Sequence, residues 1–215
     1  MSNNALVPKQ LPEIARAIGS LITRGLDQIL TETVPVVSDS PNAEFLRFKK
    51  LAEHGNVVAQ VMLAMMYATG DGVEKNAVFA ARWYQEAAEQ GHVDAQFLLG
   101  LTFHVGDGVI QNSETAVKWW RIAAEQGHAN AQLLLASAYA LGKGTEKNTA
   151  VALMWCQKAA DQGIPEAQFE LGKHYQLGIG VRQDLFAAGY WYTKAELQGH
   201  TESKERLDQL LKECK

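Results

Sequence analysis

Residues 92–127 read HVDAQFLLGLTFHVGDGVIQNSETAVKWWRIAAEQG, and the same pattern occurs in residues 56–91, 128–163 and 164–199. The period is therefore 36 residues. The residues that recur in phase include a tryptophan and a final glycine, at Trp83, Trp119, Trp155 and Trp191 and at Gly91, Gly127, Gly163 and Gly199. A fixed period of this length is the mark of a repeat architecture in which each unit stacks on its neighbours.

Each repeat is predicted to be two helices. Apolar residues recur at helical spacing from Val93 to His104 and again from Ser113 to Gln126. Between them, Gly106-Asp107-Gly108 lets the first helix stop and the chain reverse. The second helices are expected to begin after a residue that can accept a hydrogen bond from the first turn, at Asn76, Asn112, Asn148 and Asp184. The fold class is thus all-α, an array of antiparallel helix hairpins.

Within the repeat at 92–127, the first helix carries a small residue and the second helix carries a pair of large aromatic residues. Gly100 in the first helix leaves room for a neighbouring helix to approach, and the pair Trp119-Trp120 in the second helix supplies a large apolar area. Each fully buried ring stabilises such a core by about 2–3 kcal/mol. Both tryptophans are expected to lie in the core.

The segments 95–100 (AQFLLG), 106–109 (GDGV) and 123–127 (AAEQG) resemble the Sel1-like repeat family, a relative of the tetratricopeptide repeats. The resemblance implies a right-handed α-solenoid that serves as a scaffold or adaptor in protein–protein assembly, without an activity of its own. Two residues depart from the pattern, since Cys156 replaces an aromatic residue and Glu196 replaces an alanine. The cysteine pairs of the secreted branch of the family are missing.

The sequence on either side of the four repeats indicates that the chain has two regions. Residues 43–215 form the array, with a half-repeat at 43–55, full repeats at 56–91, 92–127, 128–163 and 164–199, and a capping helix at 200–215. Residues 1–42 hold an amphipathic helix over about 11–30 and a linker that contains prolines. We expect this helix to cap the array; filling its concave groove or pairing with a second copy in a homodimer are the alternatives.

Composition narrows the class of partner. Against 24 acidic residues there are 20 Lys and Arg, which gives a net charge of −4 and no basic excess for a nucleic acid. The first 30 residues lack a secretory signal pattern, and a membrane partner is disfavoured because apolar runs are interrupted by charge. Cytoplasmic localisation is therefore expected, or periplasmic if a signal has been removed.

No catalytic chemistry is predicted. Three of the six histidines, His92, His128 and His200, stand where the next helix begins, and Cys156 lies at a packing position without a second ligand at metal spacing. The Gly106-Asp107-Gly108 turn lacks the Lys-Ser/Thr that follows in a phosphate-binding loop. We therefore expect neither an enzyme nor a metal or cofactor site.

The first helices carry a second stripe, separate from the core face, that changes from apolar to charged along the array. First helices of stacked hairpins line the concave surface, so this stripe predicts a groove for a protein partner. Its expected contact residues are Val58, Met62, Met65, Met66, Leu98, Leu101, Leu134, Glu166, Glu170 and Lys173. A scaffold that binds a protein segment there is the main hypothesis, and an inhibitor or immunity-type protein that blocks an effector enzyme is the alternative.

Overall fold

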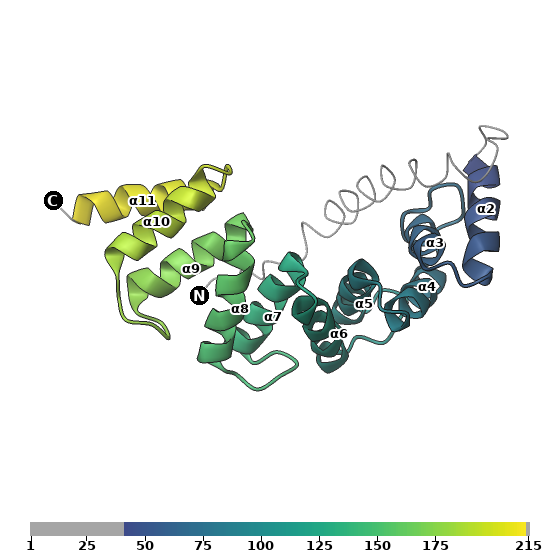
Figure 1. The fold of residues 1–215 in the computed structure, drawn as a ribbon, viewed down its shortest axis with the longest axis horizontal. Coiled ribbons are helices and arrows are strands. Elements are labelled where there is room, and N and C mark those ends of the chain that lie inside the picture. Colours follow the sequence, from purple (N-terminus) through teal and green to yellow (C-terminus); the bar gives the residue numbers. More distant parts are fainter. Residues whose placement is uncertain (1–40, 214–215) are drawn as a thin grey trace. The chain divides into compact units, whose positions relative to one another are not determined.

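A computed structural model describes residues 41–213, and these residues form ten helices and no strand (Figure 1). The prediction of an all-helical chain of consecutive helix hairpins is confirmed, whereas the amphipathic helix expected over about 11–30 lies outside the described residues. The helices are α2 (Pro41–Glu53), α3 (Val57–Thr69), α4 (Ala77–Glu89), α5 (Val93–Val105), α6 (Ser113–Glu125), α7 (Ala129–Leu141), α8 (Thr149–Asp161), α9 (Pro165–Leu177), α10 (Leu185–Glu196) and α11 (Thr201–Glu213).

The helix starts follow the capping chemistry expected from the sequence. The side chain of Asn112 accepts a hydrogen bond from the backbone N–H of Thr115 at 2.9 Å, and Asn76, Asn148 and Asp184 cap α4, α8 and α10 in the same way. This bond satisfies a donor that the helix itself leaves free.

In two of the hairpin turns, close packing requires the second glycine. A Cβ on Gly144 would overlap the carbonyl oxygen of Ser113, and a Cβ on Gly108 would overlap that of Ala77. Both glycines also have positive φ, of 74°. These two turns therefore lie directly on the backbone at the start of a second helix, where no larger residue fits.

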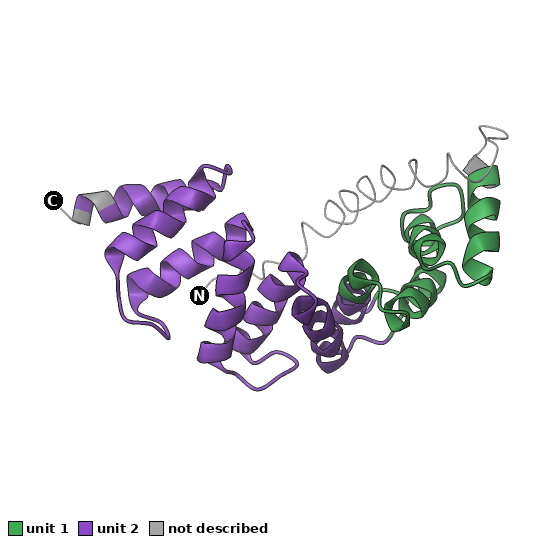
Figure 2. Ribbon diagram, in the orientation of Figure 1, with its two compact units in different colours: residues 1–98, 107–109 green, residues 99–106, 110–215 purple. Residues whose placement is uncertain are grey.

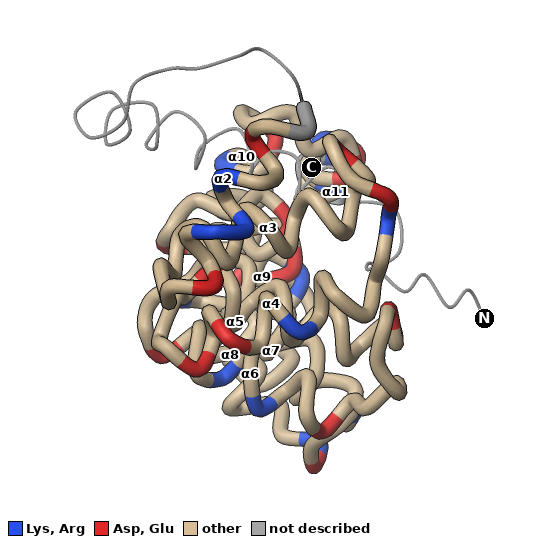
Figure 3. Tube along the Cα trace, turned by 90° about the vertical axis from the view of Figure 1, so that its right-hand side faces the viewer, with Lys and Arg blue, Asp and Glu red and all other residues tan. Residues whose placement is uncertain are grey.

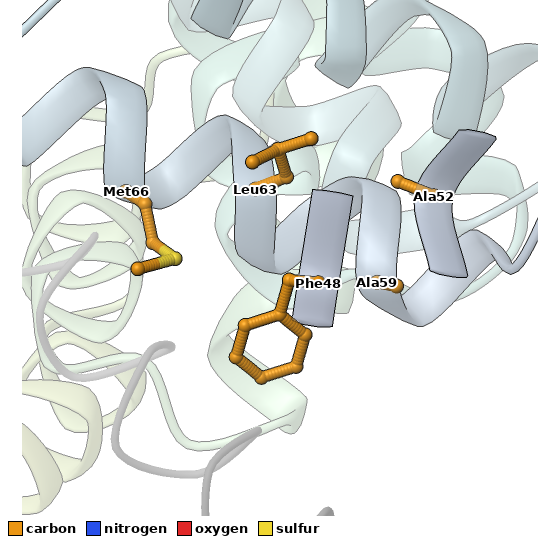
Figure 4. Close-up of a cluster of buried hydrophobic side chains, with 5 residues drawn as sticks. All are labelled: Phe48, Ala52, Ala59, Leu63 and Met66. Carbon is orange, nitrogen blue, oxygen red and sulfur yellow. The ribbon is translucent and has the colours of Figure 1, made fainter. Parts of the chain in front are cut away.

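The described chain divides into two compact units within α5 (Figure 2). Unit 1 comprises residues up to 98 together with 107–109, and unit 2 comprises 99–106 and 110 onward. In unit 1 a cluster of Phe48, Ala52, Ala59, Leu63 and Met66 joins α2 to α3 (Figure 4). The half-repeat helix α2 is thus anchored by the aromatic ring of Phe48, which is 4% exposed.

In unit 2 the last hairpin and α11 share a second cluster. Phe169 of α9 packs with Tyr192 of α10, their ring centroids lying 5.7 Å apart, and Leu210 of α11 covers the same group. Leu207 and Leu210 of α11 therefore face this cluster, while most of the other described side chains of α11 are exposed.

The two neighbouring tryptophans of α6, Trp119 and Trp120, are buried to different extents. Trp120 is 3% exposed, whereas Trp119 is only half-buried, so the expectation that both lie in the core is wrong for Trp119. Trp120 fills the space over Gly100, where a Cβ would overlap its ring, and Tyr192 likewise lies over Gly172. Neighbouring residues of a helix point about 100° apart, so only one of the pair can face α5.

A row of buried glutamines joins the hairpins. Gln132 is 4% exposed, and its side-chain amide donates to the carbonyl oxygen of Ala124 at 3.1 Å and accepts from the amide of Gln162 at 2.8 Å. The same pair of bonds recurs at Gln60 and Gln168. Hydrogen bonds that satisfy a buried amide hold it in one orientation, so these glutamines set the spacing between successive hairpins.

Candidate interaction surface

The predicted contact residues of unit 1 lie on α3 and in the first half of α5. Val58, Met62 and Met65 are half-buried, and the first two also pack on the Phe48 cluster. Met66 and Leu98 are buried, at 7% and 5% exposed. The part of the stripe that a partner could reach in unit 1 is therefore the row Val58, Met62 and Met65.

Unit 2 holds the other predicted contact residues. Leu101 is buried, at 6% exposed, and Leu134 on α7 is half-buried. On α9, Glu166, Glu170 and Lys173 are half-buried, and the ammonium group of Lys173 lies 2.9 Å from each carboxylate oxygen of Glu170. Lys173 also lies 5.3 Å from the centre of the Phe169 ring. The charged end of the stripe thus contains an internal ion pair, which leaves Glu166 as its unpaired carboxylate among the described residues.

The groove along the first helices stays a prediction. A buried side chain offers little area to a partner, so Met66, Leu98 and Leu101 would act by supporting their neighbours. The half-buried residues have both a fixed position and exposed area, which is the combination that binding surfaces use.

The structure adds residues that the stripe did not include. A shallow hollow on unit 2 is lined by Phe169 of α9 and by Glu202, Glu205, Arg206 and Gln209 of α11. Figure 3 shows residues of both charges on α11, so the hollow is polar without being strongly acidic. The spacing of Glu202, Glu205 and Gln209 along one face of α11 could have indicated this polar surface, but from the sequence α11 was interpreted only as a cap.

The candidate reactive groups have structural roles. The Nδ1 atoms of His92 and His128 accept hydrogen bonds from the first turns of α5 and α7, as expected for residues that begin a helix. Cys156 is 3% exposed, and burial raises the pKa of its thiol to about 12, so that the reactive thiolate is scarce at neutral pH. Among the described residues, no group of three or more His, Cys, Asp or Glu side chains could hold a metal ion.

No helix in the described part of the chain has the length and apolarity needed to cross a bilayer.

Comparison with known protein families gives four consecutive matches to the Sel1 repeat, at residues 57–92, 93–128, 129–164 and 165–200. Sel1 repeats are generally non-catalytic and mediate protein–protein interaction. A search of the curated proteins finds no match.

Several solved structures are similar to this chain. A protective antigen of uropathogenic Escherichia coli with an SLR fold is 36% identical, has a TM-score of 0.74, and is matched over 76% of this chain and 35% of the antigen. The match thus spans about a third of the antigen's length. A Sel1 repeat protein from Oxalobacter formigenes is also 36% identical, with a TM-score of 0.69 over 75% of this chain and 73% of its own. An immunity protein from Pseudomonas aeruginosa is 23% identical, with a TM-score of 0.50 over 85% of this chain and 68% of its own, and shares the fold alone.

Proposed function

The chain belongs to the Sel1 repeat family, and from this premise we propose that it is a non-catalytic scaffold that binds a segment of another protein along the stripe of its first helices. One observation carries the proposal. Val58, Met62 and Met65 form an apolar row on α3 that is held against the core yet half-exposed. Methionine side chains adapt to irregular apolar partners, so such a row suits a protein segment better than a small polar ligand.

The test compares two variants of the full chain as bait for affinity purification. In the first, Met62→Gln and Met65→Gln make the row polar while keeping the side-chain length. In the control, Val78→Gln changes a residue that is 62% exposed on α4 of the same unit. The wild type and the control should retain the same partner, which the first variant should lose while it remains folded at the assay temperature.

A partner retained equally by both variants, or the absence of any partner specific to the wild type, would refute the proposal.

An inhibitor of immunity type is the second candidate. The observation that favours it is the charged end of the stripe, where Glu166, Glu170 and Lys173 are half-buried on α9. An immunity protein from Pseudomonas aeruginosa shares the fold of this chain, which is consistent with this second candidate. If the co-purified partner is an enzyme, the chain should lower its rate at a one-to-one ratio, and Glu166→Gln should weaken this effect. The cytoplasmic location stays a prediction, which cell fractionation would test.

A further inference from the structure

The outward face of α10 differs from the same face of the other second helices. Phe186 is 93% exposed, Tyr190 is 55% exposed and Leu197 is 81% exposed. Thr193 is also exposed, whereas Ala188, Trp191, Tyr192 and Ala195 form the buried face of this helix. The apolar side chains therefore point away from the core of unit 2.

This exposure belongs to the position in the repeat and does not arise from the end of the array. One period earlier, α8 places Ala150, Met154 and Asp161 at the positions of Phe186, Tyr190 and Leu197, and all three are exposed. In α6 the same positions hold exposed Glu114, Lys118 and Glu125. The position thus faces solvent in these earlier repeats of unit 2, and neither α6 nor α8 carries three large apolar side chains there, so that the apolar stripe of α10 calls for a partner.

The stripe has the spacing of a coiled-coil seam. Phe186, Tyr190, Thr193 and Leu197 follow one another at steps of four, three and four residues, the spacing of a and d positions. Leu197 is the C-cap residue and keeps helical backbone angles (φ −59°, ψ −19°), so the stripe runs unbroken to this point.

The stripe is complementary to itself. When two copies of α10 pair antiparallel about the midpoint between Tyr190 and Thr193, Phe186 of each copy meets Leu197 of the other, and Tyr190 meets Thr193. The charged neighbours of the seam are Lys194 and Glu196, which carry opposite charges. Across the seam they would face the small residues Ala187 and Gly189, so that no like charges meet.

We propose that the outward face of α10 is a homodimer interface, in which the stripe Phe186, Tyr190, Thr193 and Leu197 packs antiparallel on its copy. From their exposed fractions, the three large apolar side chains offer roughly 500 Å² per copy, so a dimer buries about 1,000 Å², the lower size of specific interfaces. Interfaces at the small end of this range are often weak, so we expect a Kd of about 1–100 μM. Tyr190 is already held in place, because its ring lies 5.1 Å from that of Trp191 and the ammonium group of Lys194 lies 4.9 Å from its centre.

The oligomeric state of the full chain tests this proposal, by sedimentation equilibrium from about 1 μM to 1 mM, a range that spans that Kd. The wild type should dimerise as its concentration rises. In the double variant Phe186→Glu and Leu197→Glu, which carries the residues of α6 at these positions, the Kd should rise by roughly 100-fold or more, because carboxylates would be buried without partners. The control is Ile110→Glu with Leu141→Glu, which makes the same charge change at residues that are 90% and 72% exposed elsewhere in unit 2.

The control should dimerise like the wild type, and the unfolding midpoints of all three proteins should agree, since every changed side chain is largely exposed. A monomeric wild type at 1 mM, well above a Kd of about 100 μM, overturns the proposal. A dimer that resists the Phe186 and Leu197 changes also overturns it and places the contact elsewhere, including in the first 40 residues.

A crosslinking experiment tests the antiparallel register separately. Tyr190→Cys and Thr193→Cys are made singly in a Cys214→Ser background, and the two proteins are oxidised alone and as a mixture. The disulfide between the two different proteins should form at least several times faster than either disulfide between identical proteins. Equal rates would overturn the register even if the dimer exists.

Discussion

Gly100 and Gly189 are both helix-interior glycines of unit 2, and we expect the same substitution to have opposite effects at the two sites. Alanine at an ordinary helical position stabilises a protein by about 0.5–1 kcal/mol relative to glycine. At Gly189 of α10 the nearest described atom to an added Cβ is Cδ1 of Leu207, at 3.9 Å, which is ordinary contact. Gly189→Ala should therefore raise the free energy of unfolding by about 0.5–1 kcal/mol.

At Gly100 of α5 an added Cβ would overlap the ring of Trp120 and lie 3.2 Å from the carbonyl oxygen of Ala116. Trp120 is 3% exposed and cannot move aside into solvent. Overpacking of this kind costs about 1–3 kcal/mol or more, which exceeds the gain in helix propensity. Gly100→Ala should thus lower the free energy of unfolding by about 1–2 kcal/mol, or the unfolding midpoint by roughly 2–8 °C.

Urea-induced and thermal unfolding, followed by far-UV circular dichroism, would measure both effects. A second substitution tests the cause: Trp120→Tyr combined with Gly100→Ala reproduces the residues of the first repeat, Ala64 and Tyr84. This double variant should be more stable than the sum of the single effects by about 1 kcal/mol or more, because the clash is relieved. Additive effects, or a Gly100→Ala protein as stable as the wild type, would refute the close packing of α5 on α6.

Three further predictions concern buried or half-buried polar groups of unit 2. In the Cys214→Ser protein, Cys156 should react with a thiol reagent at least about 100-fold more slowly than in urea, since its thiol is 3% exposed with a pKa of about 12. Burial lowers the pKa of His104, so the unfolded state binds a proton more readily and stability should fall as the pH drops below about 6.5. Replacing Gln132 by Ala should cost about 1–3 kcal/mol, because the carbonyl oxygen of Ala124 would lose its partner in the core.

The predictions for His104 and Gln132 each have a comparison variant in the same unit. Native Cys156 reacting as fast as a free thiol would contradict its burial. His104→Gln introduces the residue that the fourth repeat carries at this position, Gln176. This variant should lose less stability than the wild type as the pH falls below about 6.5. An unchanged dependence of stability on pH would exclude His104 as the cause. Gln157→Ala changes a less buried side chain on α8 and should cost less than 0.5 kcal/mol, so equal losses at the two glutamines would refute the role of the buried row.

Sequence periodicity was enough to predict the helices and their order. The capping residues such as Asn112 and the helix-ending glycines such as Gly106 recur with the 36-residue period, and each acts on a few neighbouring residues. Interactions of such short range determine where a helix begins and ends, whatever the rest of the chain does. The second helices therefore begin where these residues indicated.

The depth of a side chain is a different property, which only the tertiary structure decided. Trp119 and Trp120 are equivalent by composition, yet only Trp120 faces Gly100 and is fully covered. Met66 and Leu101 belong to the same predicted stripe as Met65, but neighbouring helices bury the first two and leave Met65 half-exposed.

The buried glutamines illustrate the same limit in another way. The Ala-Gln pair is visible in every repeat, but nothing in the sequence shows that Gln132 meets Ala124 on one side and Gln162, 30 residues later, on the other. Helical periodicity determines which residues share a face of a helix. Whether that face meets another helix, a partner or water depends on chain segments distant in sequence, and only their packing in three dimensions decides it.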